Sequence, residues 1–164
     1  MSARSGGSKG MTASSPFSVR PFSPPDLEAV LQLQSGISSS PTWTGEDYLE
    51  LAGKGVLLVA ETRSDPPVVA GFAAWRLAAG EAELLNLAVA PAFRRQGAGQ
   101  TLMQASLEAL QLRHSTSLYL EVRPSNLPAI ALYKKWNFNL LHVRLNYYRN
   151  PIENAWIMHR LLIG

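Results

Sequence analysis

The spacing of apolar residues predicts a first half that alternates between short strands and short helices. Strands alternate apolar and polar side chains, whereas helices repeat apolar positions every three or four residues. The last three predicted strands of this half are joined by connections too short for a crossover, so we predict an antiparallel meander. The elements are a strand at 17–20, a helix at 26–34, a loop at 36–40, a helix at 46–52, and meander strands at 56–61, 68–77 and 81–89.

The second half alternates between helix and strand after Pro91, which ends the meander. In the helix predicted over 99–112, a stripe of four apolar residues at helical spacing indicates a core-facing side. Asn126 is the predicted N-cap of the next helix, and Pro128 suits its first turn. The remaining elements are a strand at 117–123, a helix at 127–135, and closing strands at 138–146 and 155–162. The whole predicts a mixed α/β sheet with helices on both faces.

Length and composition are typical of one globular domain. The chain has 164 residues, of which 46% are apolar and 16% charged, and this is enough for a proper core. Residues 1–15 are rich in Ser and Gly and contain no acid, so we predict a disordered N-terminal tail, with a transit peptide as the alternative. The folded domain is expected to span residues 16–164.

Composition also disfavours several kinds of site. The chain has no cysteine, which excludes disulfides, thiolate catalysis and cysteine-based metal sites. The three histidines, His114, His142 and His159, lie apart without ligand spacing, so no metal is expected. No apolar stretch approaches the roughly 20 residues that cross a bilayer. We therefore expect no membrane association, and the cytoplasm is the default location.

The charge balance is mildly basic, with a net charge of +3 and a pI of about 9.4. Nucleic-acid-binding proteins usually show a basic stripe with interleaved aromatic residues, and the sequence has no such run. No direct nucleic-acid partner is expected, and an RNA-binding factor stays as an alternative that steep salt dependence would reveal. An anionic cofactor and an anionic partner surface both fit this balance.

A hexad with two arginines and two glycines, Arg94-Arg95-Gln96-Gly97-Ala98-Gly99, lies between a predicted strand and a predicted helix. Such a turn presents backbone N–H groups and the positive end of the helix dipole, which suit a pyrophosphate. Glycines let a ligand approach the main chain closely. The spacing matches neither the dinucleotide fingerprint nor the Walker A loop. Without its context, the hexad would more often be a turn with two solvated arginines.

From Asn86 onward, the chain resembles the GNAT superfamily of acetyl-CoA-dependent N-acetyltransferases, and more narrowly the bacterial RimI branch, which acetylates protein N-terminal amines. The matching blocks keep the family's order and approximate separations over roughly the second half of the chain. They are residues 86–89, 94–99, 120–123, 125–126, 129–133 and 146–148. The resemblance implies the GNAT fold, a mostly antiparallel sheet whose fourth and fifth strands splay apart, and acetyl-CoA as co-substrate.

The resemblance also implies where acetyl-CoA binds. Backbone N–H groups of the hexad would contact the pyrophosphate, and the strand before it would bind the pantetheine arm through free main-chain groups, as an added strand would. The N–H of Val89 would polarise the thioester carbonyl. The implied cofactor-binding residues are Leu87, Ala88, Val89, Arg94, Arg95, Gln96, Gly97, Ala98, Gly99, Gln100, Asn126 and Tyr133.

Two residues are candidates for the proton transfers. Glu121 lies on the polar side of its predicted strand, where a surface glutamate is the ordinary interpretation, but it matches the family's general base. Tyr133 lies two helical turns after Asn126 and matches the tyrosine that family members aim at the CoA sulfur, and a phenol pKa near 10 keeps its proton available. Tyr147 and Tyr148 match paired tyrosines beside the substrate groove, although ordinary strand aromatics explain them equally well.

The expected function is transfer of acetyl from acetyl-CoA to the N-terminal α-amino group of proteins, by direct attack in a ternary complex. The resemblance implies that the N-terminal alanine of a small-subunit ribosomal protein is one of the acceptors. The chain departs from the family at Lys135, Trp136 and Asn137, and residues 149–154 replace a usually acidic segment, which leaves the peptide preference open. Lysine or small-molecule acetylation and a non-catalytic acyl-CoA-binding module are alternatives. A monomer or weak homo-oligomer is expected.

Overall fold

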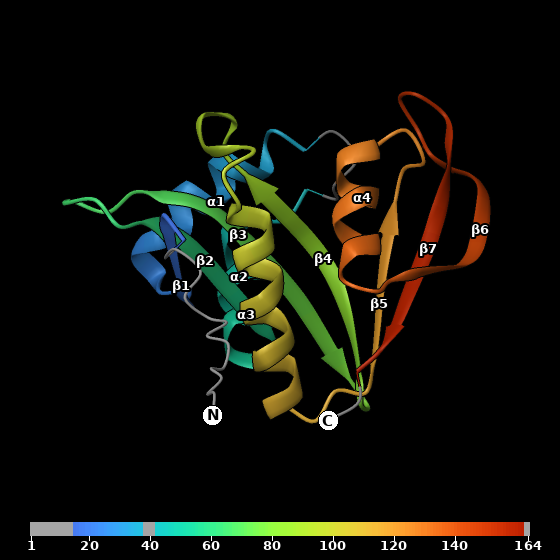
Figure 1. Cartoon of the computed structure of the whole chain (residues 1–164), viewed down its shortest axis with the longest axis horizontal. Coiled ribbons are helices and arrows are strands. Elements are labelled where there is room, and N and C mark those ends of the chain that lie inside the picture. The colour runs from blue at the N-terminus through green and yellow to red at the C-terminus, as the bar shows by residue number, and fades with distance from the viewer. Residues whose placement is uncertain (1–14, 38–41, 163–164) are drawn as a thin grey trace, which may run out of the picture.

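The computed structural model describes residues 15–37 and 42–162, which form one seven-stranded sheet with helices on both faces (Figure 1). The predicted tail, except for residue 15, and most of the predicted loop at 36–40 lie outside these residues. The helices are α1 (Leu27–Gln34), α2 (Gly45–Lys54), α3 (Ala98–Leu112) and α4 (Leu127–Lys135), with 3-10 turns η1 (Pro24–Asp26) and η2 (Pro91–Phe93). The strands are β1 (Phe17–Pro21), β2 (Val56–Thr62), β3 (Val69–Ala78), β4 (Glu81–Val89), β5 (Ser117–Val122), β6 (Asn139–Tyr148) and β7 (Glu153–Leu161).

The strand order is β1-β2-β3-β4-β5-β7-β6. Strands β2, β3 and β4 form the predicted antiparallel meander, and β1 extends it along the far side of β2. Among the described strands, β4 and β5 are the one parallel pair. The fold is therefore the mixed α/β sheet that the sequence predicts. The closing hairpin of β6 and β7 lies beside β5, because β7 pairs with both β5 and β6.

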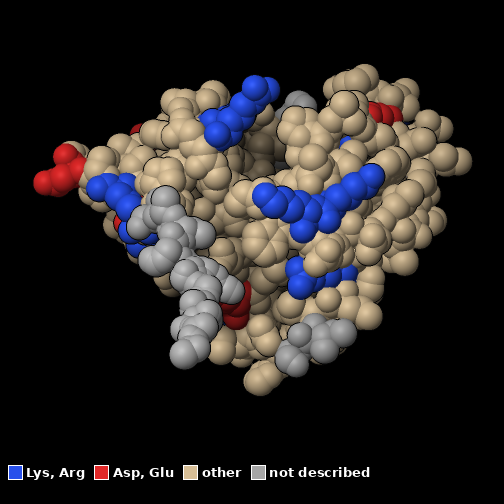
Figure 2. Space-filling view, in the orientation of Figure 1, with Lys and Arg blue, Asp and Glu red and all other residues tan. Residues whose placement is uncertain are grey.

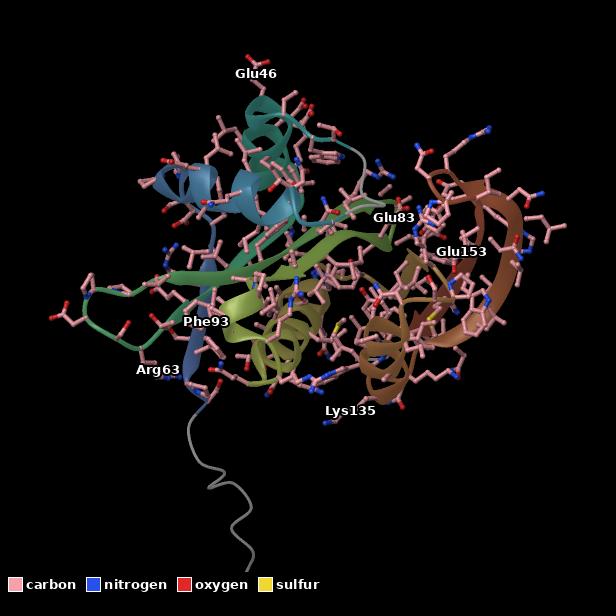
Figure 3. All side chains as sticks on the ribbon, turned by 90° about the horizontal axis from the view of Figure 1, so that it is seen from above. Glu46, Arg63, Glu83, Phe93, Lys135 and Glu153 are labelled. Carbon is pink, nitrogen blue, oxygen red and sulfur yellow. The ribbon has the colours of Figure 1, made fainter. Side chains whose placement is uncertain are left out.

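The sheet separates two hydrophobic cores. Helices α1 and α2 cover one face and α3 and α4 cover the other, as Figure 3 shows from above. The predicted apolar stripe of α3 is buried, with Leu102, Met103 and Leu110 fully enclosed. Trp75 lies in the same core and donates a 2.9 Å hydrogen bond from its indole nitrogen to the hydroxyl of Ser106. Burial of these large side chains fixes where α3 begins, and hence where the turn before it lies.

Strand β4 carries the irregularity that opens the sheet. Leu85 is an extra residue opposite β3, because Ala74 pairs with Asn86 while Trp75 pairs with Leu84. Such a bulge bends a strand and changes which side chains share a face. The pairing of β4 with β5 ends at Leu84 and Leu120, although β4 continues for five further residues. The two strands therefore splay apart beyond this point, as the family resemblance implied.

Predicted and observed element ends differ by a few residues where side chains cap or enter the core. Helix α2 starts at Gly45 because Thr44 and Asp47 form a capping box. The strand expected to reach residue 123 ends at Val122. The strand expected from Phe138 starts one residue later, because the N–H of Phe138 donates to the carbonyl of Tyr133 at the end of α4. In the described part of the chain, no helix has the length and apolar character needed to cross a membrane.

Candidate active site

The first four residues of the arginine-glycine hexad, 94–97, form an exposed turn between η2 and α3, and its last two begin α3. Arg95 and Gly97 both have a positive φ, of 62° and 91°. A Cβ built on Gly97 would meet no atom within 4 Å, so the space above this main chain is open. Figure 2 shows Lys and Arg side chains over this end of the molecule, with a hollow between them and the surface over α4. The turn is accessible, cationic and shaped to let an anionic group approach its backbone.

Helix α3 begins directly after this turn. Its N-cap is Gly97, and no side chain caps the helix. The N–H groups of Ala98, Gly99 and Gln100 therefore have no acceptor within the helix and face the turn, as the first N–H groups of any helix do. Together with the helix dipole, they make a site where the negative charge of a diphosphate is stabilised. The residues present thus fit the pyrophosphate of acetyl-CoA.

Helix α4 packs closely against this first turn of α3. A Cβ on Gly99 would lie 3.3 Å from Leu132 Cδ2, so a larger residue at this position would press on α4. The indole nitrogen of Trp136 donates a 2.7 Å hydrogen bond to Gln100 Oε1. The side chain of Gln100 was expected near the cofactor, but its amide oxygen is bonded to the Trp136 indole at the end of α4. The backbone N–H of Gln100 therefore remains available to a ligand.

The splayed part of β4 offers main-chain groups toward the gap beside β5. The N–H of Ala90 donates to the carbonyl of Ala70 on the β3 side, and main-chain groups alternate direction along a strand. The N–H groups of Leu87 and Val89 therefore point into the gap, while the main chain of Ala88 faces β3. The Val89 carbonyl accepts a 3.2 Å hydrogen bond from Arg94 Nε, which ties the arginine turn to this strand.

Tyr133 lies on α4 in the core shared with α3. Its side chain is 7% exposed, and its ring packs edge-on against Phe138. Burial raises the pKa of its hydroxyl above the usual value near 10. Within residues 15–37 and 42–162, that hydroxyl has no hydrogen-bond partner. It is a protonated donor held in place by packing. Asn126, expected to contact the cofactor, caps the same helix by accepting from the N–H of Ala129.

Glu121 lies on the opposite face of the sheet from Tyr133. Its neighbours Leu120 and Val122 belong to the core that contains Tyr133, and side chains alternate along a strand. The carboxylate is partly exposed, at 25%, and one of its oxygens lies 3.6 Å from Arg144 Nη1. Because β5 has lost its pairing with β4 here, Glu121 lies beside the gap, and Tyr133 lies in the core on the opposite face of the sheet.

Tyr147 and Tyr148 end strand β6 and line this region together, with ring centroids 5.2 Å apart. A hydrogen bond to the Glu121 carboxylate raises the pKa of Tyr147. Burial raises the pKa of Tyr148 to about 12, and the nearby charge of Glu121 adds to the rise. Tyr148 also contributes to the raised pKa of Tyr133, so it lies within electrostatic reach of both candidate residues.

Sequence reasoning missed the role of Arg123, which falls just after β5. Its guanidinium lies 4.4 Å from the ring centroid of Tyr148 and donates to the carbonyls of Pro151 and Arg149 at 3.0 Å each. It also pairs with Glu153 at 3.2 Å. Arg123 therefore holds the tip of the β6–β7 hairpin against the site. A basic residue ending a predicted apolar strand is too common a pattern to have revealed this.

A second missed group lies under the other face of β4. Asn86, placed on this face by the bulge, donates from Nδ2 to the hydroxyl of Tyr48 at 2.9 Å. Tyr48 in turn donates to Gln34 Oε1 at 2.5 Å, and Gln34 Nε2 donates to the carbonyl of Trp43 at 2.9 Å. This series of hydrogen bonds joins β4 to the end of α1 and the start of α2. No local sequence pattern around Tyr48 or Asn86 indicates these polar contacts.

The described residues contain no group of three or more His, Cys, Asp and Glu side chains placed to hold a metal ion. The functional groups that converge are instead main-chain N–H donors, a carboxylate and a phenol. N–H donors aimed at one place can bind a diphosphate and polarise a carbonyl. A carboxylate and a protonated phenol on two sides of a gap can accept one proton and supply another.

Comparison with known proteins places this geometry in context. The model of the acetyltransferase (GNAT) family matches residues 26–138. The [ribosomal protein bS18]-alanine N-acetyltransferase of Salmonella typhimurium is 37% identical over 123 residues, which cover 75% of this chain and 81% of that protein. The crystal structure of Ard1 from Thermoplasma volcanium has a TM-score of 0.79 at 32% identity, covering 91% of this chain and 99% of that one. The crystal structure of the ribosomal-protein-S18-alanine N-acetyltransferase from Escherichia coli has a TM-score of 0.76 at 29% identity. The match covers 90% of this chain and 95% of that one.

Proposed function

Because this chain belongs to the GNAT family of acetyltransferases, which use acetyl-CoA, we propose that it acetylates the N-terminal α-amino group of proteins. The named relatives from Salmonella and Escherichia coli act on the N-terminal alanine of a ribosomal protein, and we extend that acceptor to this chain. The observation that supports the proposal is the opening between β4 and β5 beyond Leu84 and Leu120, with Glu121 next along β5 and Tyr133 in the core on the other face of the sheet.

The turn and β4 hold the donor in this scheme. The N–H groups from Gln96 to Gln100 bind the pyrophosphate, and the arginines of the turn add cationic charge. The main-chain groups of Leu87 and Val89 bind the pantetheine arm in the manner of an added strand. The N–H of Val89 donates to the thioester oxygen, which gains negative charge as the amine attacks. Acetyl-CoA supplies the activated acyl group.

Glu121 and Tyr133 handle the two protons. Glu121 accepts the proton that the α-amine loses as it bonds to the acyl carbon. Only modest basicity is needed, because an α-amine has a pKa near 8 and is partly neutral at physiological pH. Tyr133 donates its proton to the departing sulfur. The acyl group passes directly from sulfur to nitrogen, and a chain without cysteine offers no thiolate for a covalent relay.

The experiment compares two peptides that share one sequence with an internal lysine. One has a free N-terminus and the other carries a blocked N-terminus. We expect mass spectrometry after incubation with acetyl-CoA to show acetylation of the free α-amine and none of the blocked peptide. Acetylation that persists on the blocked peptide would assign the activity to lysine. Binding of acetyl-CoA without transfer to any amine would indicate a non-catalytic module.

A further inference from the structure

Two side chains of β6 already contact the candidate base. Arg144 forms the 3.6 Å ion pair with Glu121, and the same carboxylate is near enough to the Tyr147 hydroxyl to raise its pKa. The Arg144 guanidinium also lies over the Tyr147 ring, 5.4 Å from its centroid. About half of the Arg144 side chain, 51%, is exposed, against 25% of the Glu121 side chain, so the guanidinium is the more accessible partner of this pair.

An acceptor ammonium that approaches Glu121 changes the balance of charge around Arg144. The ammonium takes the carboxylate as its own counter-ion, and the guanidinium is then left beside a second cation. Two positive charges at such a distance repel each other. A carboxylate carried by the acceptor close to its amine removes this repulsion and forms a new ion pair with Arg144.

The other carboxylates around Tyr147 and Tyr148 already have cationic partners. Glu83 pairs with Arg76 across β3 and β4. Glu153 pairs with Arg123 and also accepts from the backbone N–H of Ser125 at 2.8 Å. On the hairpin, Arg149 has no ion pair within the described residues. Among the described residues, the carboxylates whose charges act on Tyr147 and Tyr148 therefore each have a cationic partner, and Arg144 loses its partner when an amine takes Glu121.

We infer that Arg144 selects acceptors that carry Asp or Glu directly after the reactive N-terminal residue. The inference rests on the proposed function, because it takes the α-amine as the acceptor group. Since the contact is half-exposed, the expected preference is modest, about fivefold in kcat/KM. It should weaken as ionic strength rises, because salt screens exposed charges.

The test uses three peptides that differ only in their second residue: Ala-Asp, Ala-Asn and Ala-Lys at the N-terminus. Initial rates with saturating acetyl-CoA give kcat/KM for the wild-type chain, Arg144→Gln and Arg144→Glu. Lys54→Gln is the charge control, because Lys54 forms an exposed ion pair with Glu50 on α2 and its loss changes the net charge by the same amount as Arg144→Gln. A thermal unfolding midpoint close to wild type shows that each variant is folded.

We expect the wild-type chain and Lys54→Gln to prefer Ala-Asp over Ala-Asn, and both over Ala-Lys. The preference should disappear in Arg144→Gln and reverse in Arg144→Glu. Equal rates for the three peptides on the wild-type chain, or a preference that survives Arg144→Gln, would overturn the inference while leaving α-amine transfer intact. Transfer to none of the three peptides would reject the proposed function, and the inference with it.

Discussion

The indole nitrogen of Trp136 donates a 2.7 Å hydrogen bond to Gln100 Oε1. This bond joins the last turn of the helix that carries Tyr133 to the first turn of the helix that begins at the arginine-glycine turn. The bond thereby links the proposed diphosphate site to the proposed sulfur site and restrains the distance between them.

Replacing Trp136 by Phe keeps an aromatic ring but removes the N–H donor. We expect the free energy of unfolding to fall by about 1 kcal/mol, the usual net value of one hydrogen bond, and the KM for acetyl-CoA to rise more than kcat falls. Gln100→Ala should have a similar effect. If the bond is the cause, the double variant should cost clearly less than the sum of the single variants, and simple additivity would contradict this.

Glu121→Gln removes the candidate base with little change in size. We expect kcat to fall by roughly 10²–10³, within the range for loss of general-base catalysis, while the Kd for acetyl-CoA, measured by calorimetry, stays close to wild type. Glu50→Gln, on the exposed surface of α2, is the control and should retain wild-type kcat. An activity of Glu121→Gln equal to that of the control would remove Glu121 from the mechanism.

Tyr133→Phe separates chemistry from folding. The Tyr133 hydroxyl has no hydrogen-bond partner within the described residues, and its ring is packed against Phe138. Removing the hydroxyl therefore leaves no polar group unpaired, and we expect the unfolding free energy to stay at or slightly above the wild-type value. A fall of roughly 10²-fold in kcat should accompany this, as for loss of a general acid. A stable variant with full activity would assign the proton donor elsewhere.

Gly97→Ala tests the turn. The φ of 91° at Gly97 is strained for a residue with a Cβ, although the space around it is open. We expect a loss of about 1 kcal/mol in stability and a rise in the KM for acetyl-CoA. Gly53→Ala is the matched control, because Gly53 lies within helix α2 and its added Cβ also meets nothing. That variant should gain stability and keep the wild-type KM.

The dependence of the rate on pH follows from the raised pKa of Tyr133. Burial favours the neutral phenol, so the proton stays on oxygen to a higher pH than in free tyrosine. The acceptor α-amine loses its proton near pH 8. We expect kcat/KM to rise through that region and then to stay level through about pH 10, where an unperturbed phenol would be half ionised. A decline already at pH 9, in a chain that is still folded, would contradict the assignment.

The sequence predicted the strands, the helices and the order of the main elements, because apolar spacing and turn residues are local signals. Residues 117–122 illustrate this: alternation alone separates Leu118, Leu120 and Val122 from Tyr119 and Glu121, and the structure buries the first three. The separation of β4 from β5 could be expected only through the family resemblance. A bulge at Leu85 depends on how two strands pair, which no local pattern reports.

The contacts that orient the candidate site were harder to predict from the sequence than the strands and helices. Arg123 reaches the main chain of the β6–β7 hairpin, 26 and 28 residues away along the chain, and Asn86 reaches Tyr48 across 38 residues. Tertiary packing brings such pairs together, and the sequence next to each partner contains no pattern that predicts the contact. Arg144 likewise meets Glu121 only because the closing hairpin folds back beside β5.

A crystal structure with acetyl-CoA and an N-terminal peptide analogue bound tests the central claim most directly. We expect the diphosphate to lie on the backbone N–H groups of residues 96–100, the thioester oxygen to accept from the N–H of Val89, and the sulfur to lie beside the Tyr133 hydroxyl with the amine on the Glu121 side. A diphosphate bound elsewhere, or a sulfur out of reach of Tyr133, would contradict the account.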